Sequence, residues 1–188
     1  FARVHGLKIG SIEDLIRRRL ETEHTVERVD SRAIDTDHGA FTLHAYRDRL
    51  TRGLHYALVR GDLGGDAPVL VRVQAQNPLA DALHWRRDDF GPLVGDVLAM
   101  IAAEGRGVLV LLGDAPDAEA TLARIREQPA PPASKAGTLA QWRRTGAGSQ
   151  ILADLGLHRL RVLGTPRRQI GLAGFGLEIV EYAALPAR

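Results

Sequence analysis

Cysteine is absent from all 188 positions of the chain. Disulfide bonds, thiolate zinc sites and cysteine nucleophiles are therefore excluded as sources of stability or catalysis. A chain without cysteine is compatible with a reducing compartment, and we expect a cytoplasmic protein.

Long apolar runs are also missing. No run approaches the roughly 18 residues that a membrane-spanning helix needs, so we expect no membrane partner. The chain opens Phe-Ala-Arg-Val-His-Gly, without an initiator methionine and without the apolar segment of a signal peptide. We expect this opening to lie in the middle of a longer protein.

Lysine is scarce, occurring only at positions 8 and 135, so the calculated isoelectric point of 9.4 is due to arginine. The formal net charge is only +2, because acidic residues are interleaved with the arginines. Arg17–Arg19 and Arg167-Arg168 are the densest basic clusters, and neither comes with the aromatic platform that nucleic-acid recognition uses. We interpret them as solvated basic surface and expect no nucleic-acid partner.

The residues that are present describe a globular chain. Hydrophobic residues make up 45% of the sequence and charged residues 26%, which argues against disorder. The length predicts one domain, or one domain with an appendage.

The first half of the chain is patterned as strands. A capped helix is expected over about 11–21. Four segments that alternate apolar and polar residues follow it: 25–34, 40–46, 55–59 and 68–73. Turn-forming residues at 35–39 and 61–66 separate them in pairs, which predicts two hairpins in an antiparallel β meander.

The second half changes to helical periods and continuous strands. Apolar spacing from Leu93 to Ile101 predicts a helix that ends at Gly105. Further helices are expected from the caps Asp114 and Asp117 to about 126, over 139–155 with an interruption near 146–148, and over 167–173; strands are expected at 108–112, 159–163 and 178–182. Strands that alternate with helices after a β meander indicate an α/β domain with a mixed sheet.

Seven blocks of sequence follow one another in a characteristic order: His5–Ile12, Tyr46–Asp48, Leu58–Asp62, Pro68–Val73, Glu104–Val110, Gly146–Gly156 and Gly174–Glu181. This order resembles the GTP cyclohydrolase II half of bifunctional riboflavin-biosynthesis proteins, in which the front half is 3,4-dihydroxy-2-butanone 4-phosphate synthase. The resemblance implies that residues 1–22 are the tail and linker of such a synthase. Residues 23–188 would then form the cyclohydrolase-like domain.

The resemblance also implies a metal site, because the family carries a zinc triad Cys-x10-Cys-x-Cys whose zinc activates a water. The matching positions here are Asn77, Asp88 and Phe90. Asparagine is a weak ligand, aspartate is a possible one and phenylalanine cannot ligate. His84 and Asp88 have helical spacing, but they lie in a predicted loop and two ligands do not make a site. We expect no metal and no other cofactor in this domain, and magnesium only in the absent synthase domain.

The family's phosphate loop, Arg-Gln-Glu-Gly-Arg-Gly-Ile-Gly, falls on residues 113–120. This chain has lost both arginines there and has gained carboxylates at Asp114, Asp117 and Glu119. A triphosphate carries about four negative charges, so an acidic turn repels it.

The remaining family motifs are partly retained. The family's Asp-x-Arg-x-Tyr-Gly falls on residues 141–146, where Gln141 replaces the aspartate and Arg143 alone is kept as a catalytic candidate. Its Thr-Asn-Asn-Pro-x-Lys falls on residues 164–169. The candidate ligand-binding remnants are Arg72, Arg143, Thr165 and Arg168.

The combined loss of metal ligands, phosphate loop and base predicts a domain without cyclohydrolase activity. We expect it to act as a structural or regulatory partner of the upstream synthase domain, assembled as a homodimer. One alternative is an active enzyme with a non-standard site, recognisable by perturbed ionisable groups around Arg72, Asp88, Arg143 and Arg168. Another is a module that binds a nucleotide or flavin through Arg72, Trp142 and Arg143.

Overall fold

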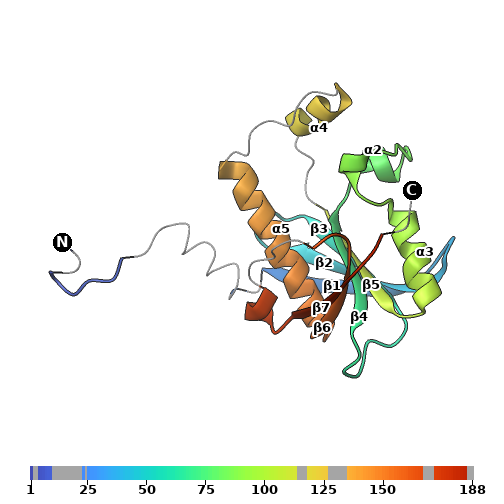
Figure 1. Ribbon diagram of the computed structural model, residues 1–188, viewed down its shortest axis with the longest axis horizontal. Helices are drawn as coiled ribbons and strands as arrows, with labels where there is room; N and C mark the ends of the chain where they lie inside the picture. Colours follow the sequence, from blue (N-terminus) through green and yellow to red (C-terminus); the bar gives the residue numbers. More distant parts are fainter. Residues whose placement is uncertain are drawn as a thin grey trace.

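The described residues form one seven-stranded mixed sheet in the order β1-β2-β3-β5-β4-β6-β7 (Figure 1). The computed structural model describes residues 1, 4–9, 23, 25–113, 118–126, 135–166 and 172–185, with side chains except at 88, 120, 124, 135–141 and 173. The strands are β1 (Val26–Thr36), β2 (Gly39–Asp48), β3 (Leu54–Arg60), β4 (Val69–Ala75), β5 (Gly107–Leu112), β6 (Arg159–Leu163) and β7 (Glu178–Ala183). The pairs β1/β2, β2/β3 and β3/β5 are antiparallel, whereas β5/β4, β4/β6 and β6/β7 are parallel. The α/β class with a mixed sheet is confirmed.

Helices cover both faces of this sheet. The helical elements are α2 (Pro78–Asp81), η1 (Asp88–Phe90), α3 (Val94–Glu104), α4 (Ala118–Ile125), α5 (Lys135–Asp154) and η2 (Leu172–Phe175). Figure 1 shows α3 and α5 on opposite sides of the sheet. None of the helices in the described part of the chain is both long and apolar enough to cross a membrane.

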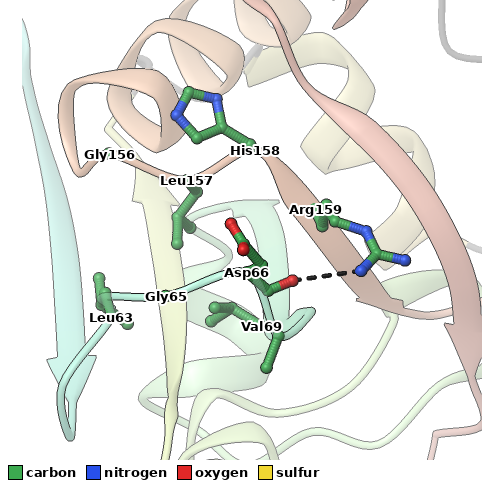
Figure 2. Close-up of a pocket in the computed structure, with 9 residues that line it drawn as sticks. Leu63, Gly65, Asp66, Val69, Gly156, Leu157, His158 and Arg159 are labelled. Atoms are coloured by element: carbon green, nitrogen blue, oxygen red, sulfur yellow. Dashed lines mark hydrogen bonds between the residues drawn. The ribbon is translucent and has the colours of Figure 1, made fainter.

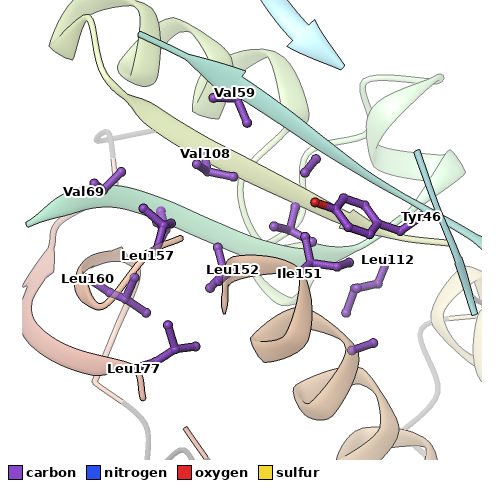
Figure 3. Packing of buried hydrophobic residues seen from close by; sticks show 14 of the residues in the cluster. Tyr46, Val59, Val69, Val108, Leu112, Ile151, Leu152, Leu157, Leu160 and Leu177 are labelled. Atoms are coloured by element: carbon purple, nitrogen blue, oxygen red, sulfur yellow. The ribbon is translucent and has the colours of Figure 1, made fainter. Parts of the chain in front are cut away.

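Two apolar clusters hold the three layers together. One joins α5 to the sheet through residues such as Val71, Val110 and Ile151, all at most 1% exposed. Figure 3 shows Ile151 and Leu152 of α5 beside the strands. The other joins α3 to the opposite face, where Val97 and Ile101 are fully buried. Alternate residues of each inner strand therefore face different helices.

The first predicted hairpin is confirmed, and the second is wrong. Strands β1 and β2 pair around Thr36↔Gly39, with a register shift between Arg28 and Asp30. Strands β3 and β4 are not neighbours, because β5 lies between them. Five of the six β5 residues are buried. A buried strand has no access to water, so its backbone groups are satisfied only when it pairs with a strand on each edge. The connection after Gly61 is a loop whose carbonyls at Leu63 and Gly64 accept hydrogen bonds from Arg106 Nη2 at 3.0 and 2.9 Å.

The predicted interruption of the helix near 146–148 is also wrong, since α5 is continuous over 20 residues. Gly148 lies against β4, and a Cβ atom added there would lie 2.8 Å from Val73 Cγ1. The glycine therefore allows close contact between helix and sheet, and this packing outweighs its low helix propensity.

The other elements agree with the sequence where they can be compared. Helix α3 ends at Gly105, whose φ of 77° is the left-handed conformation that glycine favours. The strands predicted at 108–112, 159–163 and 178–182 are β5, β6 and β7. The helix expected over 11–21, the caps Asp114 and Asp117, and residues 167–171 lie outside the described residues.

A polar cluster ties β1 and β2 to the end of α5. Tyr46 is fully buried, and its hydroxyl donates to Asp154 Oδ2 at 2.7 Å. Arg28 donates to the same oxygen through Nε at 2.9 Å and Nη2 at 2.5 Å. Burial, then the hydrogen bond and charge of Asp154, raise the pKa of Tyr46 well above its usual range.

We predict that the free energy of unfolding falls as the pH rises above about 10, the usual pKa of tyrosine. The unfolded chain releases the Tyr46 proton there, whereas the folded chain retains it, so ionisation favours the unfolded state. Tyr46→Phe should flatten this decline and lower stability at pH 7 by about 1–2 kcal/mol, through loss of a hydrogen bond to a carboxylate. Urea unfolding from pH 7 to 11 measures both effects. A parallel decline of the two proteins above pH 10 would contradict the assignment.

Candidate functional site

The candidate site lies at the edge where the parallel strands β4, β5 and β6 end. In sheets of this kind ligands bind beyond the carboxyl ends of neighbouring parallel strands. Asn77 follows β4, Gly113 follows β5 and Thr165 follows β6. The backbone N–H of Gln76 donates to Leu112 O at 3.0 Å, which joins the ends of β4 and β5.

Arg72 is held inside this edge. Its Nη1 donates to Leu163 O at 2.8 Å, and its Nε donates to Gln74 Oε1 at 3.2 Å. Two glycines leave space for the guanidinium: a Cβ atom on Gly164 would lie 2.8 Å from Nη1, and one on Gly91 would lie 3.5 Å from Nη2. Arg72 therefore joins β4 to the end of β6, and its guanidinium lies close to Gly91 in the loop before α3.

Arg143 lies on a different layer from Arg72. Val73 packs against Gly148 of α5, so the neighbouring Arg72 points to the opposite face of the sheet, which α3 covers. Arg143 is exposed on α5, next to the partly buried Trp142. The structure brings Arg72 close to the residues after β6, but the layer that carries Arg143 is on the other side.

The remaining sequence candidates are distributed around this edge. Thr165 is exposed after β6, and Glu119 is exposed on α4. Outside the described residues lie Arg168, Asp114, Asp117 and the side chain of Gln141.

One carboxylate organises the loop between β4 and α3. Asp81 Oδ2 accepts from the backbone N–H of Asn77 at 3.0 Å, and its Oδ1 accepts from that of Val94 at 3.3 Å. Asp81 thereby joins the start of α2 to the start of α3. The asparagine at the first family metal position contributes its backbone here, and its side chain makes no capping hydrogen bond.

An aromatic cluster occupies the far end of the same loop. The rings of Trp85 and Phe90 meet edge to face with centroids 5.5 Å apart. The guanidinium of Arg87 lies 5.4 Å from the centroid of Trp85 and 5.2 Å from that of Phe90. Its Nε also pairs with Asp89 Oδ1 at 2.9 Å. Phe90 therefore packs against both Trp85 and Arg87, which also contact each other, and these contacts stabilise the loop.

His84 and Asp88 do not share a helix. Helix α2 ends at Asp81, His84 has a positive φ of 54°, and Asp88 begins the 3-10 turn η1. The prediction that this segment is mainly loop is correct, although α2 and η1 each add a short turn. Across the ranges given above, no group of three or more His, Cys, Asp or Glu side chains is arranged to hold a metal ion.

A buried histidine fixes the first residue after β5. The backbone N–H of Gly113 donates to His55 Nδ1 at 3.1 Å, so Nδ1 is an acceptor and the ring proton is on Nε2. His55 is 1% exposed, and its Nε2 lies 3.6 Å from Asp48 Oδ2. Asp48 Oδ1 accepts from the backbone N–H groups of Leu50 and Thr51 at 2.6 and 3.0 Å. The turn between β2 and β3 thus supports Gly113, the first residue after β5.

The sequence did not predict this role of His55. The β2–β3 pairing places His55 opposite Tyr46, two residues before Asp48, so His55 and Asp48 lie on the same face next to the turn. A histidine in an apolar strand, seven residues after an aspartate across a turn, was the available signal.

Shifted pKa values in the described part of the chain belong to a different region. The pKa of His44 is lowered by burial and by the charge of Arg28. The pKa of Arg161 is raised by its hydrogen bond to Glu104, against a smaller effect of burial. Together with Tyr46 and with Arg28, whose pKa is also shifted, these groups lie on β1, β2 and β6, and their ion pairs, hydrogen bonds and burial explain the shifts.

A small hollow lies at the opposite edge of the sheet, before β4 and β6 begin. Its volume is about 60 Å³, and it is lined by residues that include Asp66, Leu157 and Arg159. Figure 2 shows Arg159 Nη1 donating to Asp66 O, at 3.2 Å. Such a volume holds a few waters, whereas ligand pockets have volumes of about 300–1,000 Å³. This hollow is not the candidate site.

The chain forms an α/β domain in which the carboxyl ends of three neighbouring parallel strands meet at one edge. In α/β domains this edge is the usual position of a ligand. The family model described as GTP cyclohydrolase II matches residues 27–184. The chain belongs to the GTP cyclohydrolase II family.

Relatives extend the comparison. The 3,4-dihydroxy-2-butanone 4-phosphate synthase of Pseudomonas syringae pv. tomato is 40% identical over 190 residues, covering 99% of this chain and 51% of the relative. The riboflavin biosynthesis protein RibBA of Aquifex aeolicus is 39% identical over 191 residues, covering 96% and 47%. The crystal structure of RibBX, a two-domain 3,4-dihydroxy-2-butanone 4-phosphate synthase from A. baumannii, superposes with a TM-score of 0.67 at 36% identity, covering 100% of this chain and 48% of that one. The chain spans about half the length of these relatives.

We predict that Gly113→Ala destabilises the domain by about 1–3 kcal/mol, in the range of overpacked sites. The added Cβ atom would lie 2.0 Å from Leu54 O, so the backbone has to move and the hydrogen bond to His55 lengthens. Gly64→Ala is the matched control, because its Cβ would meet only the exposed Asp62 carboxylate at 3.3 Å. Urea unfolding midpoints measure both, and equal midpoints would contradict the prediction.

Proposed function

We propose that this chain is the GTP cyclohydrolase II-like half of a protein whose other half is a 3,4-dihydroxy-2-butanone 4-phosphate synthase. In this proposal the half described here does not hydrolyse GTP. It acts as a structural or regulatory partner of the synthase half.

The contacts of Phe90 carry the proposal. A zinc cyclohydrolase needs a ligand at this position, and phenylalanine offers none. Its ring packs at 5.5 Å from Trp85 and at 5.2 Å from the Arg87 guanidinium. Phe90 thus packs in an aromatic cluster at a position where the family has a zinc ligand. This supports the interpretation that the loop has changed its role, and it does not support a metal site that is merely empty.

Charge at the neighbouring positions supports the same conclusion. Asp114, Asp117 and Glu119 stand where the family has its phosphate loop, and a triphosphate would meet carboxylates there. Gln141 stands at the position of the family's aspartate and is not a base at neutral pH. Restoring one group alone would therefore leave the other requirements unmet.

The names of the relatives support the assignment of the other half. Proteins from Pseudomonas syringae and Pseudomonas aeruginosa that match this chain over about half their length are named only as the synthase. We infer that the synthase reaction belongs to the part of the protein that this chain does not cover. Magnesium would be needed there, while this domain would use no metal or other cofactor.

The proposal includes an assembly and a location. A two-fold contact needs only one self-complementary patch, and we propose a homodimer. The absence of cysteine is consistent with the cytoplasm.

We predict no formate release from GTP by this chain above the rate without protein, with or without added zinc. The triple variant Asn77→Cys, Asp88→Cys and Phe90→Cys should also remain inactive, because the acidic loop and Gln141 persist. A formate assay measures the activity, and zinc analysis of the triple variant shows whether its metal site has formed. Formate release by a zinc-loaded triple variant would show that the loop still accepts a triphosphate.

Ligand binding without turnover is tested on the unmodified chain. Thermal unfolding is compared with and without GTP, GDP, FMN and riboflavin, since a ligand at 100 times its dissociation constant stabilises by about 2.7 kcal/mol. We expect no shift. Stabilisation that is lost in Arg72→Ala or Arg143→Ala would instead identify a nucleotide- or flavin-binding module.

We predict that the synthase half depends on this domain for its assembly. The full protein should be a dimer, and a version truncated before Phe1 should dissociate or lose activity. Light scattering and a synthase assay compare the two. Equal mass, stability and rate would contradict a scaffold role.

A further inference from the structure

A buried amide on α5 binds the main chain just before β1. Gln150 is 3% exposed. Its Oε1 accepts from the backbone N–H of Thr25 at 2.7 Å and of Val26 at 3.2 Å. Its Nε2 donates to Glu23 O at 3.0 Å. The side chain therefore binds both N–H and C=O groups of a main-chain segment more than 120 residues away.

Only a side chain with both an acceptor and a donor can make this set of contacts. A carboxylate at position 150 could accept from Thr25 and Val26 but could not donate to Glu23. An apolar residue would leave buried backbone groups without partners, which is costly. The ladder of β1 with β2 begins at Val26↔Asp48, and the O of Thr25 still accepts from the backbone N–H of Arg49 at 2.8 Å, so the contact that Gln150 adds beyond the sheet is the one to Glu23.

A second side chain on the same helix holds the next part of β1. Asp154 is four residues after Gln150, so the two lie on one face of α5. Asp154 binds Arg28 at 2.5 Å. Most of β1 beyond this point is exposed. The start of β1 is thus attached to α5 at two points one helical turn apart.

The helix is in turn rigidly attached to the sheet. Ile151 and Leu152 are 0% and 2% exposed within the core, and Gly148 lies directly against Val73. A segment bound to Gln150 is therefore fixed relative to the whole domain.

We propose that α5 carries a docking face on which Gln150 binds the chain leading into β1, at Glu23 and Thr25, and Asp154 binds β1 itself through Arg28. Gln150 sets the direction in which the chain arrives at the domain. Where an upstream domain is present, which rests on the proposed function, Gln150 also limits how that domain can turn relative to α5.

Amide hydrogen exchange tests the docking face on the 188-residue chain. In Gln150→Met, which keeps the length of the side chain but not its amide, exchange at Thr25 and Val26 should accelerate at least tenfold. Exchange at the β5 amides 108–112 should change less than twofold. Ser149→Ala is the matched control: Ser149 is equally buried at 3%, but its hydroxyl donates within the helix, to Thr145 O at 2.8 Å.

Equal acceleration at Thr25, Val26 and β5 would mean general destabilisation and would overturn the proposal, as would no change at all. Gln150→Glu provides a second variant if the methionine variant does not fold. It keeps the acceptor, so Thr25 and Val26 should stay within threefold of their original rates. Acceleration equal to that in Gln150→Met would overturn the assignment of these amides to Gln150.

The effect on an upstream domain has a separate measurement. Small-angle scattering of the longer protein should show a broader range of interdomain distances in Gln150→Met than in Ser149→Ala, and an unchanged range would overturn this part. The exchange result does not depend on what lies upstream. A failure of the proposed function would appear instead in the truncation comparison.

Discussion

The fold depends on the burial of β5 between an antiparallel and a parallel neighbour. Val108, Leu109 and Val110 are fully buried, so this strand has to pair on both edges and be covered on both faces. Strand β3 supplies one edge and β4 the other, while α3 and α5 supply the covers. The change from antiparallel to parallel pairing at β5 places the ends of β4, β5 and β6 together. The edge that holds Arg72 follows from this arrangement.

Local pattern predicted the elements better than their pairing. The strand over 159–163 and the helix that ends at Gly105 follow from apolar spacing and one glycine, which are properties of neighbouring residues. The position of β5 between β3 and β4 depends on contacts far apart in sequence, and alternation within a strand does not specify its neighbour. Gly148 was misjudged for the same reason: its partner is Val73, 75 residues earlier.

The sequence predicted the chemical character of the site residues better than it predicted their positions and contacts. That Phe90 cannot bind a metal follows from its chemistry, but its contacts with Trp85 and Arg87 required the loop to be seen folded. Arg72 and Arg143 were grouped because the family uses both, whereas here they lie on different layers of the sheet. His55 went unrecognised because its partner is the backbone of Gly113, and a backbone partner leaves no mark in the sequence.

The irregular register between Arg28 and Asp30 has a consequence for self-association. Strand β1 is one edge of the sheet that the described residues form, and its side chains are exposed along most of its length; an edge of this kind can pair with a strand from another molecule. A bulge at this point breaks the regular spacing of the backbone groups, and charged side chains at Glu27, Arg28, Asp30 and Arg32 surround it. The bulge and the charged side chains therefore make the β1 edge a poor template for continued strand addition, which opposes aggregation.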